Sequence, residues 1–313
     1  MFEDRQALKS PSGAVLRFHA EEAAAPPRGI VTICHGLAEH ARRYAAFARA
    51  LSAAGFHVYA HDHRGHGETT APDAPIGRFA HRDGVSAVVA DALAMRAEAV
   101  ARHPGLPVIL FGHSMGGLIA LNTAEQAPEA YAGLAVWNSN LAPGLAGRAA
   151  LGVLAVERML LGSDVPSPLL PRLTFEAWGR AVPGHRTLFD WLSRDPAVVD
   201  AYVADPLCGF AASVSLWQDV FRLTFRAMEP ARLDRLPRGL PIHLVGGGAD
   251  PATYRAKATR TLSKKLQDSG FSDVTTQIYH DMRHETLHEI GREAAIAEFS
   301  AWCGRVAGAR LPE

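Results

Sequence analysis

The sequence predicts an α/β fold, in which a mostly parallel central sheet is flanked by helices and is interrupted once by an inserted helical cap. Through the first half of the 313 residues, short runs rich in Val and Ile alternate with longer Ala-rich stretches of helical period. That alternation is typical of parallel strands crossed by helices. From about residue 138 to 235 it gives way to helical segments with scattered Pro and Trp, and strand-like runs resume only afterwards.

The strand-like runs of the first half each end in a Gly, His or Asn cluster, as strands that lead into binding loops do. They lie at residues 29–34 (GIVTIC), 56–60 (FHVYA), 107–111 (PVILF) and 132–137 (AGLAVW). Two further strands are expected after the insertion, at residues 241–245 (PIHLV) and 273–279 (DVTTQIY).

The helices expected between these strands are Ala-rich and amphipathic. They cover residues 39–54, 85–102 and 115–126, and a final helix follows over about 292–305. Gly55 suits the C-terminus of the first helix. The predicted division is a core segment 1–137, a helical cap 138–235 and a second core segment 236–313.

Charge and cysteine content restrict the class of protein. Lys plus Arg and Asp plus Glu both number 32, so no net charge would attract nucleic acid, and we expect no nucleic-acid partner. Three distant cysteines without a C-x-x-C pair suggest neither a disulfide framework nor a cysteine zinc site. The N-terminus lacks an apolar signal-like region and no long apolar span follows, so we expect a cytoplasmic protein. The oligomeric state cannot be predicted.

The strongest local signal is a G-x-S-x-G pattern, Gly112-His113-Ser114-Met115-Gly116, between a predicted strand and a predicted helix. A serine on such a sharp turn is held with its hydroxyl exposed, and glycines are needed because side chains would collide with neighbouring backbone. A bare G-x-S-x-G often occurs by chance, but this strand and helix context favours Ser114 as a nucleophile over a merely Gly-rich helix start.

A serine hydroxyl needs a base, and the base needs an orienting acid. Asp250 fits the acid, since it follows the strand PIHLV and an expected flexible turn at glycines 246–248, and it precedes the last strand, although it could also be a simple turn residue. Three histidines after the last strand could be the base: His280, His284 and His288. We favour His284, because its loop position lets the imidazole reach over the sheet to Ser114.

The same segment matches a zinc pattern. His284-Glu285-Thr286-Leu287-His288 reads H-E-x-x-H, in which two histidines hold the metal and a glutamate acts as base. The match begins within a few residues of a strand end, and fifteen histidines make chance pairs common. We therefore expect neither metal nor cofactor, and the zinc protease stays a minor alternative.

Acyl transfer also needs two N–H donors for the developing oxyanion, one after the nucleophile and one after an earlier strand. Met115 supplies the first and Leu37, in the loop after GIVTIC, the second. We interpret the side chains of His35 and Glu39, in the same loop, as helix-start residues. The segment Asp62-His63-Arg64-Gly65-His66-Gly67 contains two histidines, but we interpret it as structural, with turns at its glycines and with Asp62 and Arg64 holding the loop in place.

Together these segments resemble the monoacylglycerol lipase and lysophospholipase branch of the α/β-hydrolase superfamily. The resemblance runs from about residue 29 to the final helix through HGLAEHARRY, DHRGHG, GHSMGG, SRDPAVVDAYVADP, GGGADP and RHE. It implies the α/β-hydrolase fold, the triad Ser114, Asp250 and His284, the oxyanion donors Leu37 and Met115, and hydrolysis of monoacylglycerols, lysophospholipids or simpler esters.

The cap is the least informative region about substrate. Residues 144–161 (GLAGRAALGVLAVERMLL) form an apolar helix candidate that is too charged to span a bilayer. It can line an acyl tunnel, make transient contact with a lipid surface, or belong to the core of the cap. The expected function is a serine ester hydrolase for a small acyl ester; a short-chain carboxylesterase, a thioesterase and a non-catalytic binding protein remain alternatives.

Overall fold

The computed structural model describes residues 2 and 4–308, and a single mixed sheet runs through them. Its eight strands have the order β1-β2-β4-β3-β5-β6-β7-β8. The six parallel strands are β3 (Gly29–Cys34), β4 (Phe56–His61), β5 (Val108–His113), β6 (Gly133–Trp137), β7 (Ile242–Gly247) and β8 (Val274–Tyr279). The predicted α/β class with a mostly parallel sheet is confirmed.

Two N-terminal strands were not predicted. β1 (Gln6–Lys9) and β2 (Val15–Glu21) pair antiparallel with each other, and β2 pairs antiparallel with β4. They form the edge of the sheet, so β1 alternates partly buried and exposed residues instead of showing the continuous apolar run of a central strand. Strands of such mixed composition carry little signal in the sequence.

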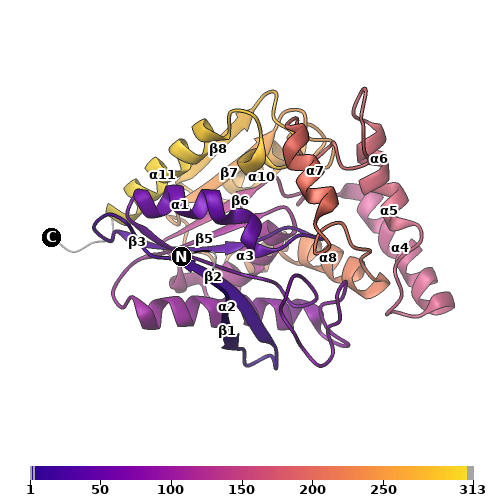
Figure 1. Ribbon diagram of the computed structural model, residues 1–313, viewed down its shortest axis with the longest axis horizontal. Coiled ribbons are helices and arrows are strands. Elements are labelled where there is room, and N and C mark those ends of the chain that lie inside the picture. The colour runs from indigo at the N-terminus through magenta and orange to yellow at the C-terminus, as the bar shows by residue number, and fades with distance from the viewer. Residues whose placement is uncertain (1, 3, 309–313) are drawn as a thin grey trace.

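The central strands are buried on both faces, which explains their continuous apolar runs. In β3, Ile30 and Cys34 pack into one hydrophobic core, whereas Val31 and Ile33 pack into the other. Helices α1 (Ala45–Ala53) and α11 (Arg292–Gly308) contribute to the second core, while α2 (Gly84–Arg102), α3 (Met115–Gln126) and α10 (Lys257–Asp268) contribute to the first. Figure 1 shows α1 and α11 on one side of the sheet and α2 on the other.

The helix predicted at residues 39–54 is shorter than expected. A 3₁₀ turn, η1 (Ala41–Tyr44), precedes α1, and the chain from Gly36 to His40 stays a loop. Gly55 follows the helix with φ of 89°, as a helix-terminating glycine does. The expected helices at 85–102, 115–126 and 292–305 occur with small shifts at their ends, and α10 was not predicted.

The chain between β6 and β7 is mainly helical and leaves the sheet. It contains α4 (Gly144–Leu161), α5 (Leu170–Leu173), α6 (Phe175–Arg180), α7 (Pro196–Ala204), α8 (Val214–Arg226) and α9 (Pro230–Leu233). Figure 1 shows α4, α5 and α6 at one end of the molecule, while α8 packs against α2 and α3 of the core. Nowhere in the described chain does a helix combine the length and apolar character needed to cross a membrane.

Candidate active site

Ser114 lies at the turn between β5 and α3 in a conformation that L residues rarely adopt, with φ of 54° and ψ of −120°. Hydrogen bonds from neighbouring segments hold this turn. The Ser114 N–H donates to the carbonyl of Trp137 at 2.8 Å, and the Ser139 hydroxyl donates to the carbonyl of Ser114 at 2.8 Å. Strain of this kind persists only where surrounding contacts impose it, and it directs the side chain off the carboxyl end of the sheet.

The glycines of the G-x-S-x-G pattern are required by close backbone contacts. A Cβ on Gly112 would lie 2.2 Å from the carbonyl oxygen of Gly116, and one on Gly116 would lie 2.0 Å from that of Cys34. Both separations are well inside van der Waals contact. The glycines therefore let α3 begin directly behind Ser114 and against the end of β3.

The structure brings Ser114, His284 and Asp250 into one hydrogen-bonded chain. His284 Nε2 lies 2.9 Å from Ser114 Oγ, and His284 Nδ1 lies 2.9 Å from Asp250 Oδ2. A carboxylate can only accept, so Nδ1 carries the proton and Nε2 is free to take the serine proton. Asp250 is fully buried and accepts two more hydrogen bonds, from the N–H of Ala252 at 2.8 Å and the hydroxyl of Thr253 at 2.7 Å.

The turn that carries Asp250 differs from the flexible Gly-rich turn expected from the sequence. Gly246 and Gly247 are the buried end of β7. A Cβ on Gly247 would lie 2.1 Å from the carbonyl oxygen of Arg283, and one on Gly248 would lie 2.3 Å from that of His280. These glycines thus allow the loop of residues 280–288, which carries His284 and which we call the histidine loop, to pack directly onto the loop after β7 that carries Asp250.

The two other candidate histidines point elsewhere. The His280 side chain is 98% exposed and pairs with Asp281. His288 ends a 3₁₀ turn, η3 (Thr286–His288), with Nε2 3.0 Å from the carbonyl oxygen of Arg43 and Nδ1 3.4 Å from Glu285. Because His284 already contacts Ser114 and Asp250 through its two nitrogens, the H-E-x-x-H residues have no common point at which to bind a metal.

Leu37 and Met115 both line the cavity at Ser114, and neither backbone N–H has a hydrogen-bond partner within the described residues. Met115 is the first residue of α3, where N–H groups lack an intrahelical acceptor. His35 holds the peptide group that carries the Leu37 N–H. Its Nε2 accepts the His63 N–H at 2.9 Å, so the ring proton is on Nδ1, which donates to the Gly36 carbonyl at 2.8 Å.

That contact fixes a peptide plane. The Gly36 carbonyl and the Leu37 N–H belong to the same planar peptide group and point in opposite directions across a trans bond. Holding the carbonyl against buried His35 therefore turns the Leu37 N–H away from His35. The sequence interpretation left the side chain of His35 as a helix-start residue and missed this role.

Comparisons with known proteins agree with this arrangement. Residues 25–291 match the family described as serine aminopeptidase, S33. The chain belongs to this family of α/β hydrolases. It is similar to the monoacylglycerol lipase of Mycolicibacterium smegmatis, with 31% identity over 88% of each chain, and to human monoglyceride lipase, with 30% identity over 96% of this chain and 90% of that protein. The resemblance to monoacylglycerol lipases predicted from the sequence is confirmed.

A solved structure supports the fold assignment of this S33 family member. The crystal structure of a thermostable carboxyl esterase from Bacillus coagulans in complex with glycerol superposes with a TM-score of 0.86. The two share 24% identity, and the match covers 97% of this chain and 98% of that one. The α/β-hydrolase fold expected from the sequence is thereby confirmed.

A buried polar network lies behind Ser114, His284 and Asp250 in this S33 family member. Glu39 accepts hydrogen bonds from the N–H of Gly36 at 2.5 Å, from Tyr44 at 2.9 Å and from Arg43 at 2.5 Å. Arg43 also binds both carboxylate oxygens of Glu285, at 2.6 and 2.7 Å. Burial acts to raise the pKa of Glu39, but the neighbouring Arg43 and His113 hold it well below its ordinary value.

His113 joins this network to the histidine loop. Its Nε2–H donates to the His284 carbonyl at 3.0 Å, and its Nδ1 lies 3.5 Å from Glu39 Oε1. Burial acts to lower the pKa of His113, but Glu39 outweighs it and the net shift is upward. The loop of residues 35–40, which we call the oxyanion loop after its proposed role, the turn at Ser114 and the histidine loop are thus linked through Glu39, which the sequence interpretation treated only as a helix-start residue.

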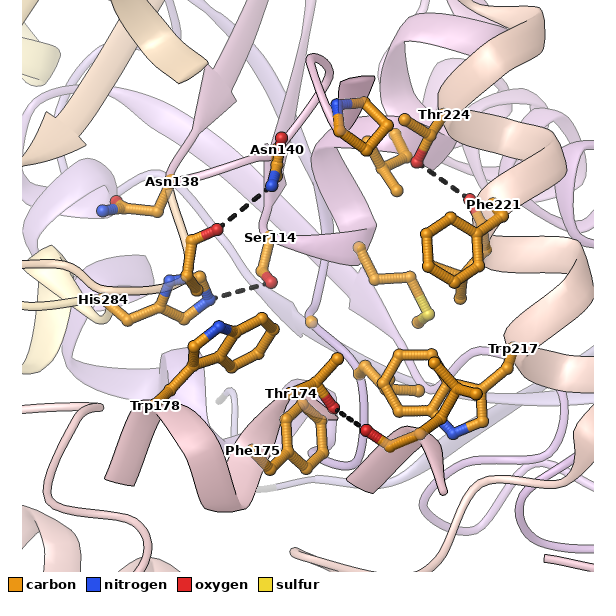
Figure 2. A pocket seen from close by; sticks show the side chains of 18 of the residues that line it. Ser114, Asn138, Asn140, Thr174, Phe175, Trp178, Trp217, Phe221, Thr224 and His284 are labelled. Carbon is orange, nitrogen blue, oxygen red and sulfur yellow. Dashed lines mark hydrogen bonds between the residues drawn. The ribbon is translucent and has the colours of Figure 1, made fainter. Parts of the chain in front are cut away.

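An elongated, mostly apolar cavity of about 440 Å³ opens beside Ser114. Figure 2 shows Ser114 and His284 facing each other at one end, with Trp178 next to them and Trp217 and Phe221 farther along. Helices α4, α5, α6 and α8 supply much of the lining. The segment between β6 and β7 also holds the histidine loop, because the N–H of Glu285 donates to the Leu192 carbonyl at 2.8 Å.

Proposed function

We propose that the protein is a serine hydrolase that cleaves single-chain acyl esters, monoacylglycerols or lysophospholipids, through an acyl-enzyme intermediate. The observation that carries this proposal is the hydrogen-bonded chain of Ser114, His284 and Asp250 at one end of an apolar cavity. The monoacylglycerol lipases among its relatives favour the same substrate class.

The reaction begins with attack of Ser114 Oγ on the ester carbonyl carbon while His284 Nε2 accepts the hydroxyl proton. The negative charge on the carbonyl oxygen is stabilised by the N–H groups of Leu37 and Met115. The imidazolium then gives its proton to the departing alcohol oxygen, and the acyl group stays on Ser114 as an ester. Water, deprotonated by the same histidine, releases the fatty acid and restores the serine.

The apolar lining of the cavity is the reason to propose a lipid substrate. Its lining is dominated by aliphatic and aromatic side chains, and polar groups such as Asn138 and Asn140 lie near Ser114. An acyl chain therefore fits the apolar length while the glycerol or headgroup stays near the polar end. Each CH₂ that becomes buried contributes about 0.8 kcal/mol, equivalent to about a fourfold gain in kcat/KM per carbon.

The test is hydrolysis of monoacylglycerols and lysophospholipids of graded acyl length, together with labelling by a fluorophosphonate probe. We expect kcat/KM to rise with chain length until the cavity is filled, and labelling to disappear in Ser114→Ala. Preference for the shortest acyl groups would indicate a short-chain carboxylesterase or thioesterase instead. Lack of both labelling and hydrolysis would indicate a binding protein.

We also propose that residues 138–235 act as a cap over the active site and that this cap makes transient contact with lipid surfaces through α4. One face of α4 lines the cavity through Ala146, Ala150 and Val153. Its other residues include Leu145, Met159 and Leu160, whose exposed fractions are 84%, 77% and 70%. A helix that is apolar on both faces while one face meets water suits the boundary of a lipid phase.

The lipid contact is tested by sedimentation with phosphatidylcholine vesicles. We expect the wild-type protein to co-sediment and a Leu145→Ser/Met159→Ser/Leu160→Ser variant to bind several-fold less. Its hydrolysis of a water-soluble short-chain ester should stay unchanged, since these side chains are exposed to solvent. Equal vesicle binding of both proteins would contradict the proposed contact.

A further inference from the structure

Three residues with metal-binding side chains meet where the chain between β6 and β7 packs on the oxyanion loop. His40, Asp205 and Cys208 each offer one ligand atom, and these three atoms lie within 4.8 Å of one another. The imidazole nitrogen and the carboxylate oxygen are 2.9 Å apart. His40 is buried, whereas Asp205 and Cys208 are partly exposed, so solvent reaches one side of the cluster.

The local backbone prepares this arrangement. The Cys208 N–H donates to the Asp205 carbonyl at 3.0 Å, which closes a tight turn and places both side chains on the same side. Asp205 Oδ1 accepts the Leu207 N–H at 2.9 Å, so Oδ2 is left to face His40. His40 directly precedes η1 and lies three residues after Leu37. It therefore belongs to the oxyanion loop, whereas Asp205 and Cys208 belong to the chain between β6 and β7.

The same contact is anchored to the oxyanion loop by the main chain. The carbonyl of Ala38, a residue with φ of 56°, accepts the Gly209 N–H at 2.9 Å and the Tyr202 hydroxyl at 2.8 Å. The turn at 205–208 is thus held beside the loop that carries Leu37 even without any ligand, and little rearrangement is needed to bring three donors onto one ion.

The donor types select the ligand. One imidazole nitrogen, one thiolate sulfur and one carboxylate oxygen form a set that suits Zn²⁺, and three protein ligands leave a fourth position for water.

We propose that His40, Asp205 and Cys208 form a binding site for a thiophilic divalent cation of the zinc type. On binding, the metal–sulfur bond forms as the thiol proton leaves to solvent, so binding releases one proton and strengthens as pH rises. The bound ion joins the turn at 205–208 to the oxyanion loop. This site shares no residue with the H-E-x-x-H pattern and is independent of the proposed ester hydrolysis.

Titration of the reduced, chelator-treated protein with Cd²⁺ tests the site, because a cadmium–thiolate bond gives an ultraviolet charge-transfer band. Cys34 and Cys303 are fully buried, so the band reports on Cys208. We expect a band that saturates at one equivalent in the wild-type protein and is absent in Cys208→Ala. His40→Gln and Asp205→Asn should keep the band but need at least tenfold more Cd²⁺.

Zn²⁺ and a control variant complete the experiment. Zn²⁺ is expected to raise the Tm of the wild-type protein in a concentration-dependent way and to leave that of Cys208→Ala unchanged. Within the described residues, Glu22, His57 and His103 form another group of metal-type donors, which shares no residue with the proposed site. Glu22→Gln should therefore bind Cd²⁺ and Zn²⁺ at Cys208 as the wild type does. A missing band, a band that persists in Cys208→Ala, or equal Zn²⁺ stabilisation of the wild-type protein and Cys208→Ala would overturn the proposal. These outcomes do not depend on whether the protein hydrolyses esters.

Discussion

At the scale of single residues, the proposed catalysis depends on which tautomer two histidines adopt. His284 must keep its proton on Nδ1 to leave Nε2 for Ser114, and His35 must keep its proton on Nδ1 to hold the Gly36 carbonyl. In each case a neighbour that can only accept or only donate decides the tautomer: Asp250 for His284 and the His63 N–H for His35.

The first prediction concerns Asp250→Asn. The amide can donate to Nδ1, which favours the tautomer with the proton on Nε2 and removes the base from Ser114. We expect kcat to fall by about 10⁴-fold with a well-folded protein. The measurement is steady-state hydrolysis beside thermal unfolding. Asp281→Asn, an exposed neighbour of the histidine loop, serves as the control and should keep wild-type kcat.

A second prediction concerns the oxyanion loop. His35→Phe removes the donor to the Gly36 carbonyl and frees the peptide that carries the Leu37 N–H, so kcat is expected to fall by about 10²-fold with a smaller change in KM. His35→Asn, which offers an N–H at a similar position, should recover part of the rate.

The control for this pair is His61→Phe. His61 is also buried, and its ring nitrogens have no hydrogen-bond partner within the described residues. A loss of kcat in His61→Phe as large as that in His35→Phe would show that the effect comes from general destabilisation of the core and would contradict the positioning role.

At the scale of helices and strands, the site depends on loops at the carboxyl ends of parallel strands. Leu37 follows β3, Ser114 follows β5, Asp250 follows β7 and His284 follows β8. Parallel strands bring these ends to one edge of the sheet, so residues distant in the chain meet there. Glycines at the strand ends then decide how closely the loops approach one another.

The third prediction belongs to this scale. In Gly116→Ala the new methyl group would meet the Cys34 carbonyl, and α3 must move away from β3. We expect the free energy of unfolding to fall by about 1–3 kcal/mol, and kcat to fall as Met115 shifts. Denaturant unfolding and kinetics on the same preparation measure both effects.

Gly152→Ala is the matched control. Gly152 lies within α4, and a Cβ there meets no atom within 4 Å. Alanine is the better helix former by about 1 kcal/mol, so this variant should be equally or slightly more stable. If Gly116→Ala were as stable and as active as Gly152→Ala, the close packing of α3 on β3 would not matter for the site.

At the scale of the whole molecule, buried histidines link stability to pH. His35, His61, His63 and His66 are fully buried together behind the oxyanion loop, and burial is the largest cause that lowers the pKa of each. The pKa of His66 falls to about 4. Each of these imidazoles is therefore neutral in the folded protein at a pH where the unfolded chain is protonated.

The fourth prediction follows from this difference. Between the ordinary value of 6.5 and about 4, His66 binds a proton in the unfolded chain but not in the folded one, so its contribution to the free energy of unfolding decreases as pH falls. For His66 alone the full loss is about 3 kcal/mol, on the basis of 1.36 kcal/mol per pKa unit. Urea unfolding at several pH values between 7 and 4.5 measures it.

A pair of variants isolates the contribution of His66. In His66→Asn the dependence of stability on pH should be weaker, whatever the change in absolute stability. His280→Ala removes a solvent-exposed imidazole and should leave the dependence as in the wild type. An equally steep dependence of stability on pH in His66→Asn and in the wild type would contradict the prediction.

Local sequence patterns were sufficient to predict the α/β class, the parallel strands, the inserted helical segment and the proposed nucleophile and acid. These features are written in local patterns: continuous apolar runs, Ala-rich helical periods, and G-x-S-x-G between a strand and a helix. Strands β1 and β2 were not predicted, because their composition is mixed. For the base, the local pattern offered three histidines, and the preference for His284 rested on loop position and family resemblance.

Contacts between segments that are distant in the chain could not be predicted and are known from the three-dimensional structure. Ser114 and His284 are 170 residues apart, Arg43 and Glu285 are 242 apart, and Tyr202 lies 164 residues from Ala38. Such pairs leave no periodic pattern in the chain, because they depend on which loops the sheet brings to its carboxyl edge. The tautomers of His35 and His284, the network around Glu39, the apolar cavity and the cluster at Cys208 all arise from that convergence.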